Sequence, residues 1–319
     1  DSPAYKVVFI ASGVGMLVSL VWFWFGRAQL KGVGRPPEGA EGGGRVLMTA
    51  IGALVAIPVI YFLLSMGASS LQWVLTAMFV GLGVMLLVEG IREGSVARDK
   101  VIALLIIFAF NVLFWMFFEQ AGSSFNFLAQ NIVNRDFGGW IFPVGWFQSV
   151  NSLAIITLAP VVAWIWVKLG RANPSIPRKF GLGIIFNGLA FLLLMIALSS
   201  MVDPQSLKIP FWTLFMVYVI QSIGELCLSP IGLSMVTKLA APKNVGLSMG
   251  GWFLGTAVAN YLAGRISAIA SGGGGHGEAA SSLAQYSQTF TMLIWAGLIV
   301  GGIYFLFAPL INKLMHGVK

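Results

Sequence analysis

The most constraining feature of this sequence is a series of long apolar stretches separated by short polar linkers. A bilayer core about 30 Å thick is crossed by roughly 20 apolar helical residues. Nine stretches reach that length: 6–26, 46–66, 71–91, 101–128, 144–167, 180–202, 211–240, 245–270 and 287–311. Because backbone polar groups in lipid must be satisfied within the protein, each stretch is predicted to be a transmembrane helix. The chain is therefore predicted to be an all-α polytopic membrane protein surrounded by membrane lipids.

Composition excludes several other classes. Of the 319 residues, 58% are hydrophobic and only 9% are charged, whereas soluble domains carry about 25% charged residues. A water-surrounded fold, a disordered chain and a nucleic-acid-binding protein are therefore excluded. The single cysteine, Cys227, permits no intrachain disulfide.

The distribution of basic residues predicts the orientation of the chain. Lys and Arg accumulate in the cytoplasmic loops of membrane proteins. If the first span runs from outside to inside, fifteen of the nineteen basic residues fall in cytoplasmic linkers. The other four are Lys6, Arg135, Lys208 and Arg265. We therefore expect the N-terminus outside and the C-terminus in the cytoplasm.

The number of spans predicts the domain organisation. Many transporter folds are built from repeats of three or six helices, and nine spans divide into one, two and six. We assign residues 1–26 to the last helix of an N-terminal bundle, 27–45 to a cytoplasmic linker and 46–92 to an inserted two-helix hairpin that faces lipid. Residues 100–313 form a six-helix C-terminal bundle, and residues 314–319 form a cytoplasmic tail. The opening residues, which lack an initiator Met, suggest the middle of a longer protein.

Two acidic residues lie well inside apolar spans. Nine of the eleven acids are in linkers or at span ends, and the exceptions are Glu119 and Glu225. A charge at the bilayer centre costs roughly 2.5 kcal/mol or more, so such residues are functional candidates. They could face a water-filled cavity and bind protons or a cationic group, or they could join helices by hydrogen bonds.

Polar and aromatic residues accompany both acids along their helices. Trp115 lies four residues before Glu119, so the two share one helix face. Ser229 lies four residues after Glu225, and the following Pro230 removes a backbone hydrogen bond and bends the helix. Each acid thus shares a helix face with a polar or aromatic side chain, and such a face is suited to the wall of a cavity.

Two further spans carry candidate residues. Asn151 offers two amide donors and an acceptor, so it could hold a peptide-like group or bond to a neighbouring helix. Trp252 is bracketed by small residues several positions inside its span. It could line a side-chain pocket or pack in the core.

Enzymatic and metal sites are not indicated by the sequence. The two histidines, His276 and His316, lie in or beside linkers and have no partners at ligand spacing. A Ser-His-Asp arrangement needs a buried histidine, and a nucleotide-binding fingerprint follows a strand. We expect no metal, no cofactor and no enzymatic activity.

Four ordered strings carry a resemblance to a known family. They are FWMFFEQAGSSFNFLAQ, FQSVNSLAIITLAPVVAWIW, GELCLSPIGLSMVTKLA and MGGWFLGTAVANYLAG. These strings look like helices seven, eight, ten and eleven of the proton-coupled oligopeptide transporter (POT) family, a branch of the major facilitator superfamily. The resemblance covers essentially the whole chain. It implies a partial major-facilitator fold in a bacterial inner membrane, with a periplasmic N-terminus.

The family's function implies roles for the candidate residues. Its members carry di- and tripeptides together with protons by alternating access. Glu225 resembles the carboxylate that pairs with the peptide's amino terminus, and Asn151 resembles the amide that helps to hold this end. Glu119 resembles the protonatable carboxylate that couples proton entry to closure. The residues that resemble cavity-lining positions are Trp115, Ser229 and Trp252.

The chain also departs from the family. It lacks the acidic-basic motif of the first helix and the basic residues that receive the peptide carboxylate, and Ser152 follows Asn151 where the family commonly has proline. We expect an N-terminal bundle, present as another chain or a missing segment, to complete the cavity. Two alternatives stay open: another major-facilitator symporter, for nitrate or a drug-like solute, and a membrane subunit of a proton-translocating complex, which would need intramembrane lysines.

Overall fold

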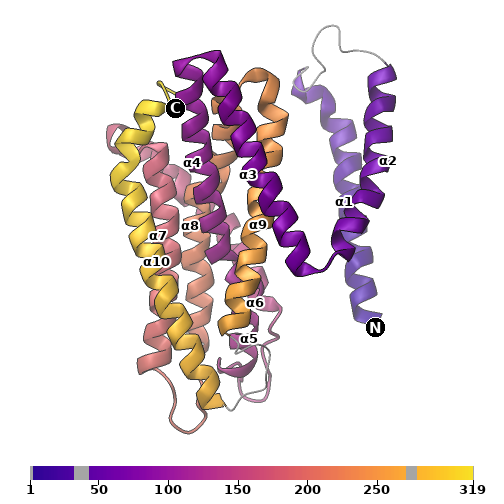
Figure 1. Ribbon diagram of the computed structural model, residues 1–319. Helices are drawn as coiled ribbons and strands as arrows, with labels where there is room; N and C mark the ends of the chain where they lie inside the picture. Colours follow the sequence, from indigo (N-terminus) through magenta and orange to yellow (C-terminus); the bar gives the residue numbers. More distant parts are fainter. Residues whose placement is uncertain (1–2, 32–42, 271–278, 319) are drawn as a thin grey trace. The chain divides into compact units, whose positions relative to one another are not determined.

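Each predicted span forms one long helix, apart from a break in the fourth (Figure 1). The computed structural model describes residues 3–31, 43–270 and 279–318. The long helices are α1 (Pro3–Gly26), α2 (Gly43–Ser65), α3 (Ala68–Glu93), α4 (Ser95–Phe118), α6 (Trp146–Leu169), α7 (Ile176–Ser200), α8 (Phe211–Leu239), α9 (Val245–Ala270) and α10 (Ala279–Leu314). Short elements are η1 (Arg27–Leu30), η2 (Glu119–Gly122), α5 (Ser124–Asn131), η3 (Gly170–Ala172) and η4 (Pro242–Asn244).

Length and hydropathy confirm the prediction of a multi-pass, all-α membrane protein. Within the described residues, eight helices are long and apolar enough to cross a bilayer. The 26-residue helix α9 falls outside this set, because its glycines, Asn260 and Arg265 lower its mean hydropathy. It nevertheless packs within the same bundle, against α3 and α4.

The chain divides into two compact units, residues 1–66 and 67–319. In the first unit, α2 buries none of its residues. The boundary lies between α2 and α3, so it divides the predicted hairpin. The assignment of residues 46–92 to an inserted hairpin stays a prediction, as do the other domain boundaries.

Helix α3 belongs to the second unit and packs against other helices there, whereas the sequence pattern predicted that the hairpin faces lipid. It contacts α4 and α9 and buries Leu86 and Gly90. The missing side chain at Gly90 lets α4 approach closely, because a Cβ there would lie 3.0 Å from a methyl group of Val101. Gly94, with φ +113°, reverses the chain between α3 and α4. The sequence did not predict this contact, because the face of α3 that packs on other helices is as apolar as the rest of the helix.

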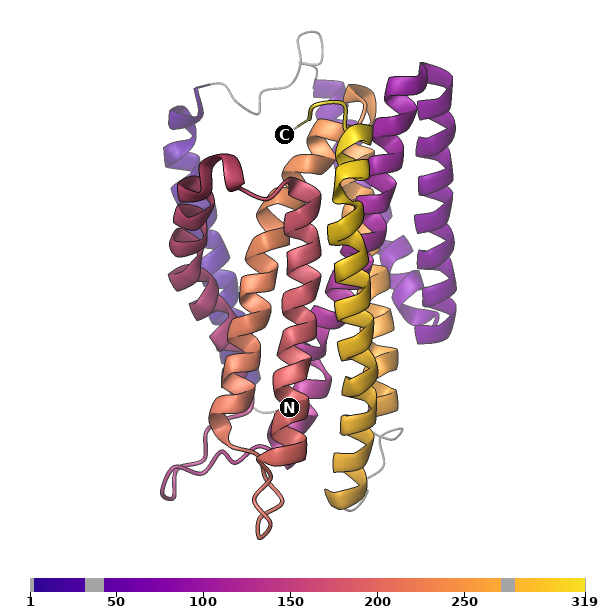
Figure 2. The same ribbon diagram turned by 90° about the vertical axis from the view of Figure 1, so that its left-hand side faces the viewer.

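Glycines bring α7 into close contact with its neighbours. A Cβ at Gly183 would lie 2.9 Å from the carbonyl oxygen of Gly224 in α8. On another face, a Cβ at Gly297 of α10 would lie 3.1 Å from the Cα of Gly188. Small residues at such crossings allow close backbone packing, which drives helix association in membranes. Helices α7 and α10 accordingly lie side by side over their length (Figure 2).

A substitution at the crossing of α7 and α8 tests this packing. We expect Gly183→Ala to lower the free energy of unfolding by about 1–3 kcal/mol, because the added methyl group meets backbone that cannot move aside. The measurement is denaturant or thermal unfolding of the detergent-solubilised protein. The control is Gly302→Ala in α10, where an added Cβ meets nothing within 4 Å. Equal stability of the two variants would contradict the close-packing account.

Candidate functional site

A break in the fourth span places Glu119 at a change of helix type. Helix α4 ends at Phe118, Glu119 begins the 3-10 segment η2, and α5 continues from Ser124. The span predicted at residues 101–128 is therefore interrupted. The Glu119 side chain is half-buried. It accepts no hydrogen bond from any residue in the described parts of the chain.

Side chains from two other helices satisfy the carbonyl groups that the break releases. The amide nitrogen of Gln148, in α6, donates to the carbonyl oxygen of Ala121 at 2.7 Å. The Tyr218 hydroxyl, in α8, donates to the same oxygen at 2.9 Å. Gln221 donates to the carbonyl oxygen of Phe117 at 3.4 Å. In a membrane such groups find no water, so these bonds hold the broken helix in place.

Helix α9 supports the break from another side. The amide nitrogen of Gln120, which is fully buried, donates to the carbonyl oxygen of Ala263 at 3.1 Å. Its amide oxygen accepts a hydrogen bond from the Ser124 hydroxyl. The Ser123 hydroxyl donates to the carbonyl oxygen of Glu119 at 3.1 Å. Three helices, α6, α8 and α9, thus fix the backbone that carries Glu119.

Asn151 and Glu225 meet across the contact between α6 and α8. The Asn151 Nδ2 atom donates to Glu225 Oε2 at 3.0 Å and also to Ser222 Oγ at 3.0 Å. The Ser222 hydroxyl donates to the carbonyl oxygen of Tyr218 at 2.8 Å, so its oxygen faces the amide. We call Glu119, Asn151, Ser222 and Glu225 the acid–amide cluster. The structure thereby joins Asn151 to Glu225 by a hydrogen bond, and the Glu119 carboxyl group lies within electrostatic range of the Glu225 carboxyl group.

The two carboxyl groups of the cluster share one electrostatic environment. Glu119 and Glu225 are near enough for their charges to repel each other. Within the described residues, the ion pairs involve Asp99, Glu89 and Glu93, all close to helix ends, and none involves either acid of the cluster. Glu225 is half-buried, as Glu119 is. A proton or a cation from outside these residues would relieve the repulsion, so the cluster can bind either one.

The remaining predicted residues lie in different surroundings. Trp115 is half-buried, and its ring packs edge-on against that of Phe118, with 5.2 Å between the ring centroids. Its Nε1 has no hydrogen-bond partner among the described residues. Ser229 is half-buried and forms no hydrogen bond with Glu225. Trp252 is only 3% exposed, and its indole covers Gly232, where it leaves no room for a side chain. Trp252 is thus placed in the packing between α8 and α9.

Sequence reasoning missed two residues of this region. Ser222 lies three residues before Glu225, so helical spacing could have placed it on the same face. Tyr218 lies one turn earlier still, but its hydroxyl bond to Ala121 joins residues 97 positions apart. No local pattern reveals such a contact.

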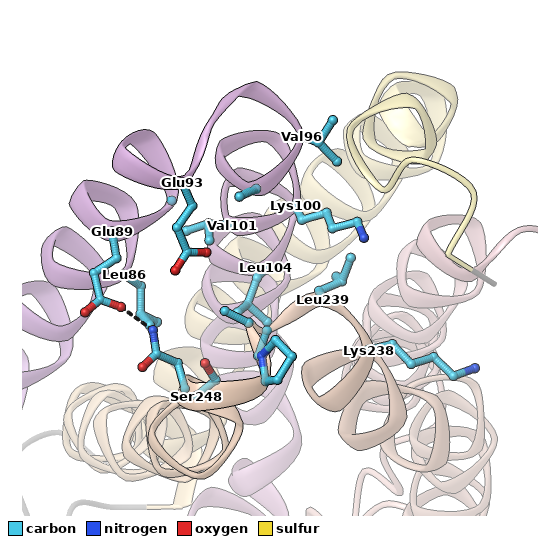
Figure 3. A pocket seen from close by; sticks show the side chains of 16 residues that line it. Leu86, Glu89, Glu93, Val96, Lys100, Val101, Leu104, Lys238, Leu239 and Ser248 are labelled. Atoms are coloured by element: carbon cyan, nitrogen blue, oxygen red, sulfur yellow. Dashed lines mark hydrogen bonds between the residues drawn. The ribbon is translucent and has the colours of Figure 1, made fainter.

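A separate charged cluster ties α3 to η4, the segment before α9. Its two acids, Glu89 and Glu93, are labelled in Figure 3. Lys243 Nζ lies 2.7 Å from Glu93 Oε1 and 3.9 Å from Glu89 Oε2, and Asn244 donates a hydrogen bond to Glu89. The hydrogen bond to Glu93 and the charges of both acids raise the pKa of Lys243. The cluster borders a cavity of about 330 Å³ whose wall includes Ser248. It anchors α3 at one end of the bundle.

Solved structures with this arrangement of helices define the class of the protein. A crystal structure of peptide transporter POT in complex with sulfate matches with a TM-score of 0.70 and 29% identity, covering 98% of this chain and 63% of that chain. A mutant of peptide transporter POT in complex with alafosfalin matches with a TM-score of 0.71 and 30% identity, covering 99% and 63%. The chain therefore has part of the major-facilitator fold of membrane transporters.

Sequence relatives place the chain more closely. Dipeptide and tripeptide permease A of Edwardsiella piscicida is 31% identical over 315 residues, which are 98% of this chain and 64% of the relative. Uncharacterized transporter YclF of Bacillus subtilis (strain 168) is 28% identical over 322 residues, 98% of this chain and 62% of the relative. The POT family model matches residues 1–281. The chain belongs to the POT family, and it spans less than two thirds of the length of these relatives.

The hydroxyl bond of Tyr218 offers a test of how the broken helix is held. We expect Tyr218→Phe to lower the free energy of unfolding by about 1 kcal/mol, because the Ala121 carbonyl loses one of its two donors. Amide hydrogen exchange should increase in residues 119–127. The control is Tyr261→Phe in α9, whose hydroxyl has no hydrogen-bond partner among the described residues. A similar loss of unfolding free energy in both variants would contradict the proposal that the Tyr218 hydroxyl stabilises the broken helix.

Proposed function

We propose that this chain supplies the C-terminal half of a proton-coupled symporter of di- and tripeptides that works by alternating access. An N-terminal helical bundle, on another chain or in a segment outside residues 1–319, would complete the cavity. Membership of the POT family supports this function. The name of the Edwardsiella relative, which describes a dipeptide and tripeptide permease, points to the same substrates. The proposed activity is transport, and no catalytic step is required.

One observation carries the proposal: two neighbouring carboxyl groups lie in a membrane-embedded site without a cation from the described residues. Glu225 is held by the Asn151 amide, and Glu119 lies close enough to feel its charge. A charged acid in a membrane needs a partner. The ammonium group of a peptide and a proton are the two species that a peptide symporter brings to such a site.

Each residue then has a proposed role. Glu225 pairs with the amino terminus of the peptide, and Asn151 orients this carboxylate and helps to hold the ammonium group. Ser222, which is fully buried, holds the Asn151 amide in place. Glu119 takes up the proton that couples entry to closure. The half-buried side chains of Trp115 and Ser229 fit a place in the cavity wall. Trp252 was expected to contact peptide, but its burial favours support of the wall from behind.

We also propose a location and an orientation. The protein resides in the inner membrane of a bacterium, with the N-terminus of this chain in the periplasm and the C-terminus in the cytoplasm. The positive-inside bias of the linkers supports this orientation, because fifteen of nineteen basic residues fall on the same side.

The proton-coupling role of Glu119 is tested by removing its charge in the complete transporter. We expect Glu119→Gln to abolish uptake of a dipeptide driven by an inward proton gradient, because the amide cannot take up and release the proton. Exchange of peptide across the membrane without a gradient should continue. Both are measured with radiolabelled dipeptide in proteoliposomes.

The matched control is Asp203→Asn, which removes a carboxylate from an exposed loop. This variant should keep proton-driven uptake at the level of the parent protein. Normal acid-driven uptake in Glu119→Gln would remove this residue from the coupling step.

The amino-terminus role of Glu225 is tested by comparing two kinds of substrate. We expect Glu225→Gln to weaken binding of peptides with a free amino terminus by about tenfold or more, because a charge-assisted hydrogen bond is lost. Peptides with an acetylated amino terminus should bind more weakly to the parent protein and lose little further affinity in the variant. Competition against a labelled dipeptide measures the affinity of each kind of peptide for the parent protein and for the variant. An equal loss for both kinds of peptide would argue against this pairing.

A further inference from the structure

A large cavity with a basic wall lies at the end of the bundle that carries the C-terminus, since Gly317 and Val318 belong to its wall. It has a volume of about 890 Å³ and lies between the connection from α6 to α7, the second half of α8 and the end of α10. The charged residues of its wall are Arg171, Arg178, Lys179 and Lys238. No acidic residue belongs to the described wall. Such a cavity has a positive potential and attracts anions.

Lys179 is the most informative residue of this wall. Its side chain is only 8% exposed, and within the described residues it has neither a carboxylate partner nor a hydrogen-bond acceptor. The ring of Trp166 stabilises its charge, with the ring centroid 4.6 Å from Nζ. Most of this side chain is removed from water, so its positive charge is stabilised by an anion beside it. The described residues supply no carboxylate there, and Lys179 lines the cavity, where an anion from outside can reach it.

The backbone next to Lys179 is also suited to an anion. Ser175 directly precedes the 25-residue helix α7, and Lys179 lies in the first turn of this helix. The N-terminus of a helix carries free N–H groups and a partial positive charge. A serine at this position usually caps one of these groups, but the Ser175 hydroxyl is buried without any hydrogen-bond partner. Pro177 has no N–H group, and the Lys179 N–H donates to the carbonyl oxygen of Ser175. The Ser175 hydroxyl and the N–H groups of Ile176 and Arg178 thus remain for a ligand.

The positive-inside bias does not account for this arrangement. That rule explains why basic residues gather in the linkers at one side of the membrane. It is satisfied by exposed residues such as Arg171 and Arg178. It gives no reason to bury Lys179 beside an unpartnered hydroxyl at a helix N-terminus.

Helix α8 and the end of the chain add apolar side chains to the wall of the cavity. These are Pro230, Ile231 and Met235 of α8, which lie beside Ser234 and Lys238 of the same helix, and Val318 beyond α10. A phosphate group near Lys179 and Ser175 would leave any attached glycerol or acyl chain against these side chains. The chemistry of the wall thus matches an amphiphilic anion.

We propose that this cavity binds a phosphate group, carried either by an anionic phospholipid or by free phosphate. Lys179 pairs with the phosphate oxygens, Ser175 and the first turn of α7 donate hydrogen bonds to them, and Arg171 and Arg178 form the basic rim. The apolar side chains of α8 favour the phospholipid as the source. Binding here is separate from the acid–amide cluster, so the proposal does not rest on peptide transport.

Three probes separate the two sources in the complete transporter, purified in a neutral detergent. They are short-chain phosphatidylglycerol, inorganic phosphate and a short-chain diacylglycerol, which has no phosphate. The readout is the midpoint of thermal unfolding at increasing probe concentration. We expect phosphatidylglycerol to raise the midpoint and diacylglycerol to leave it unchanged. A rise with inorganic phosphate as well would assign free phosphate to the site, and no rise with phosphate would assign the lipid.

Variants identify the cavity as the place of binding. We expect Lys179→Met to weaken phosphatidylglycerol binding about fivefold or more, the size expected for one basic residue beside an anionic lipid. Arg171→Met, at an exposed position, should weaken it in the same direction without a risk to folding. The control is Lys313→Met, which removes an exposed charge from the same end of the bundle outside the cavity wall.

Two outcomes would overturn the proposal. One is an unchanged response to phosphatidylglycerol and phosphate in both Lys179→Met and Arg171→Met. The other is a loss in Lys313→Met as large as in Lys179→Met, since this would show attraction to the basic surface in general. If a carboxylate of the N-terminal bundle already pairs with Lys179, the first outcome is the one expected.

Discussion

The structure depends on one constraint of the bilayer, which is that a released backbone carbonyl finds no water to bind. The change from α4 to η2 releases such groups beside Glu119. Gln148 and Tyr218 donate to the carbonyl oxygen of Ala121, and Gln221 donates to that of Phe117. These bonds come from α6 and α8, which also carry Asn151 and Glu225. The same contacts that repair the broken helix therefore bring its acid to the acid–amide cluster.

Uncompensated charge then indicates where ligands can act. Glu119 and Glu225 lie near each other without a cation from the described residues, and Lys179 is buried without an anion from them. Elsewhere, Lys243 pairs with Glu93, so acids and bases of this chain do meet where the fold allows it. The difference suggests two kinds of ligand: protons and peptide ammonium groups at the cluster, and a phosphate group at the end of α7.

Several features could be predicted from the sequence because they depend on local composition. The length of the apolar stretches predicted the helices. Acids are rare inside these stretches, so Glu119 and Glu225 could be singled out as candidates. The packing of α3 could not be predicted, because its apolar residues suit lipid and protein equally and only the gap at Gly90 decides between them. Trp252 was ambiguous for the same reason. A tryptophan between small residues suits a pocket wall as well as a helix contact.

The sequence by itself determined that the chain spans a membrane, which residues bear charge within it, and that its motifs resemble those of one transporter family. Each of these follows from residues close together in the chain, since a span or a helix face repeats over a few positions. The tertiary structure alone decided that Asn151 bonds to both Ser222 and Glu225, that Trp252 covers Gly232, and that no carboxylate of the described residues pairs with Lys179. Such contacts join positions on separate helices, and their geometry is set by how whole helices pack.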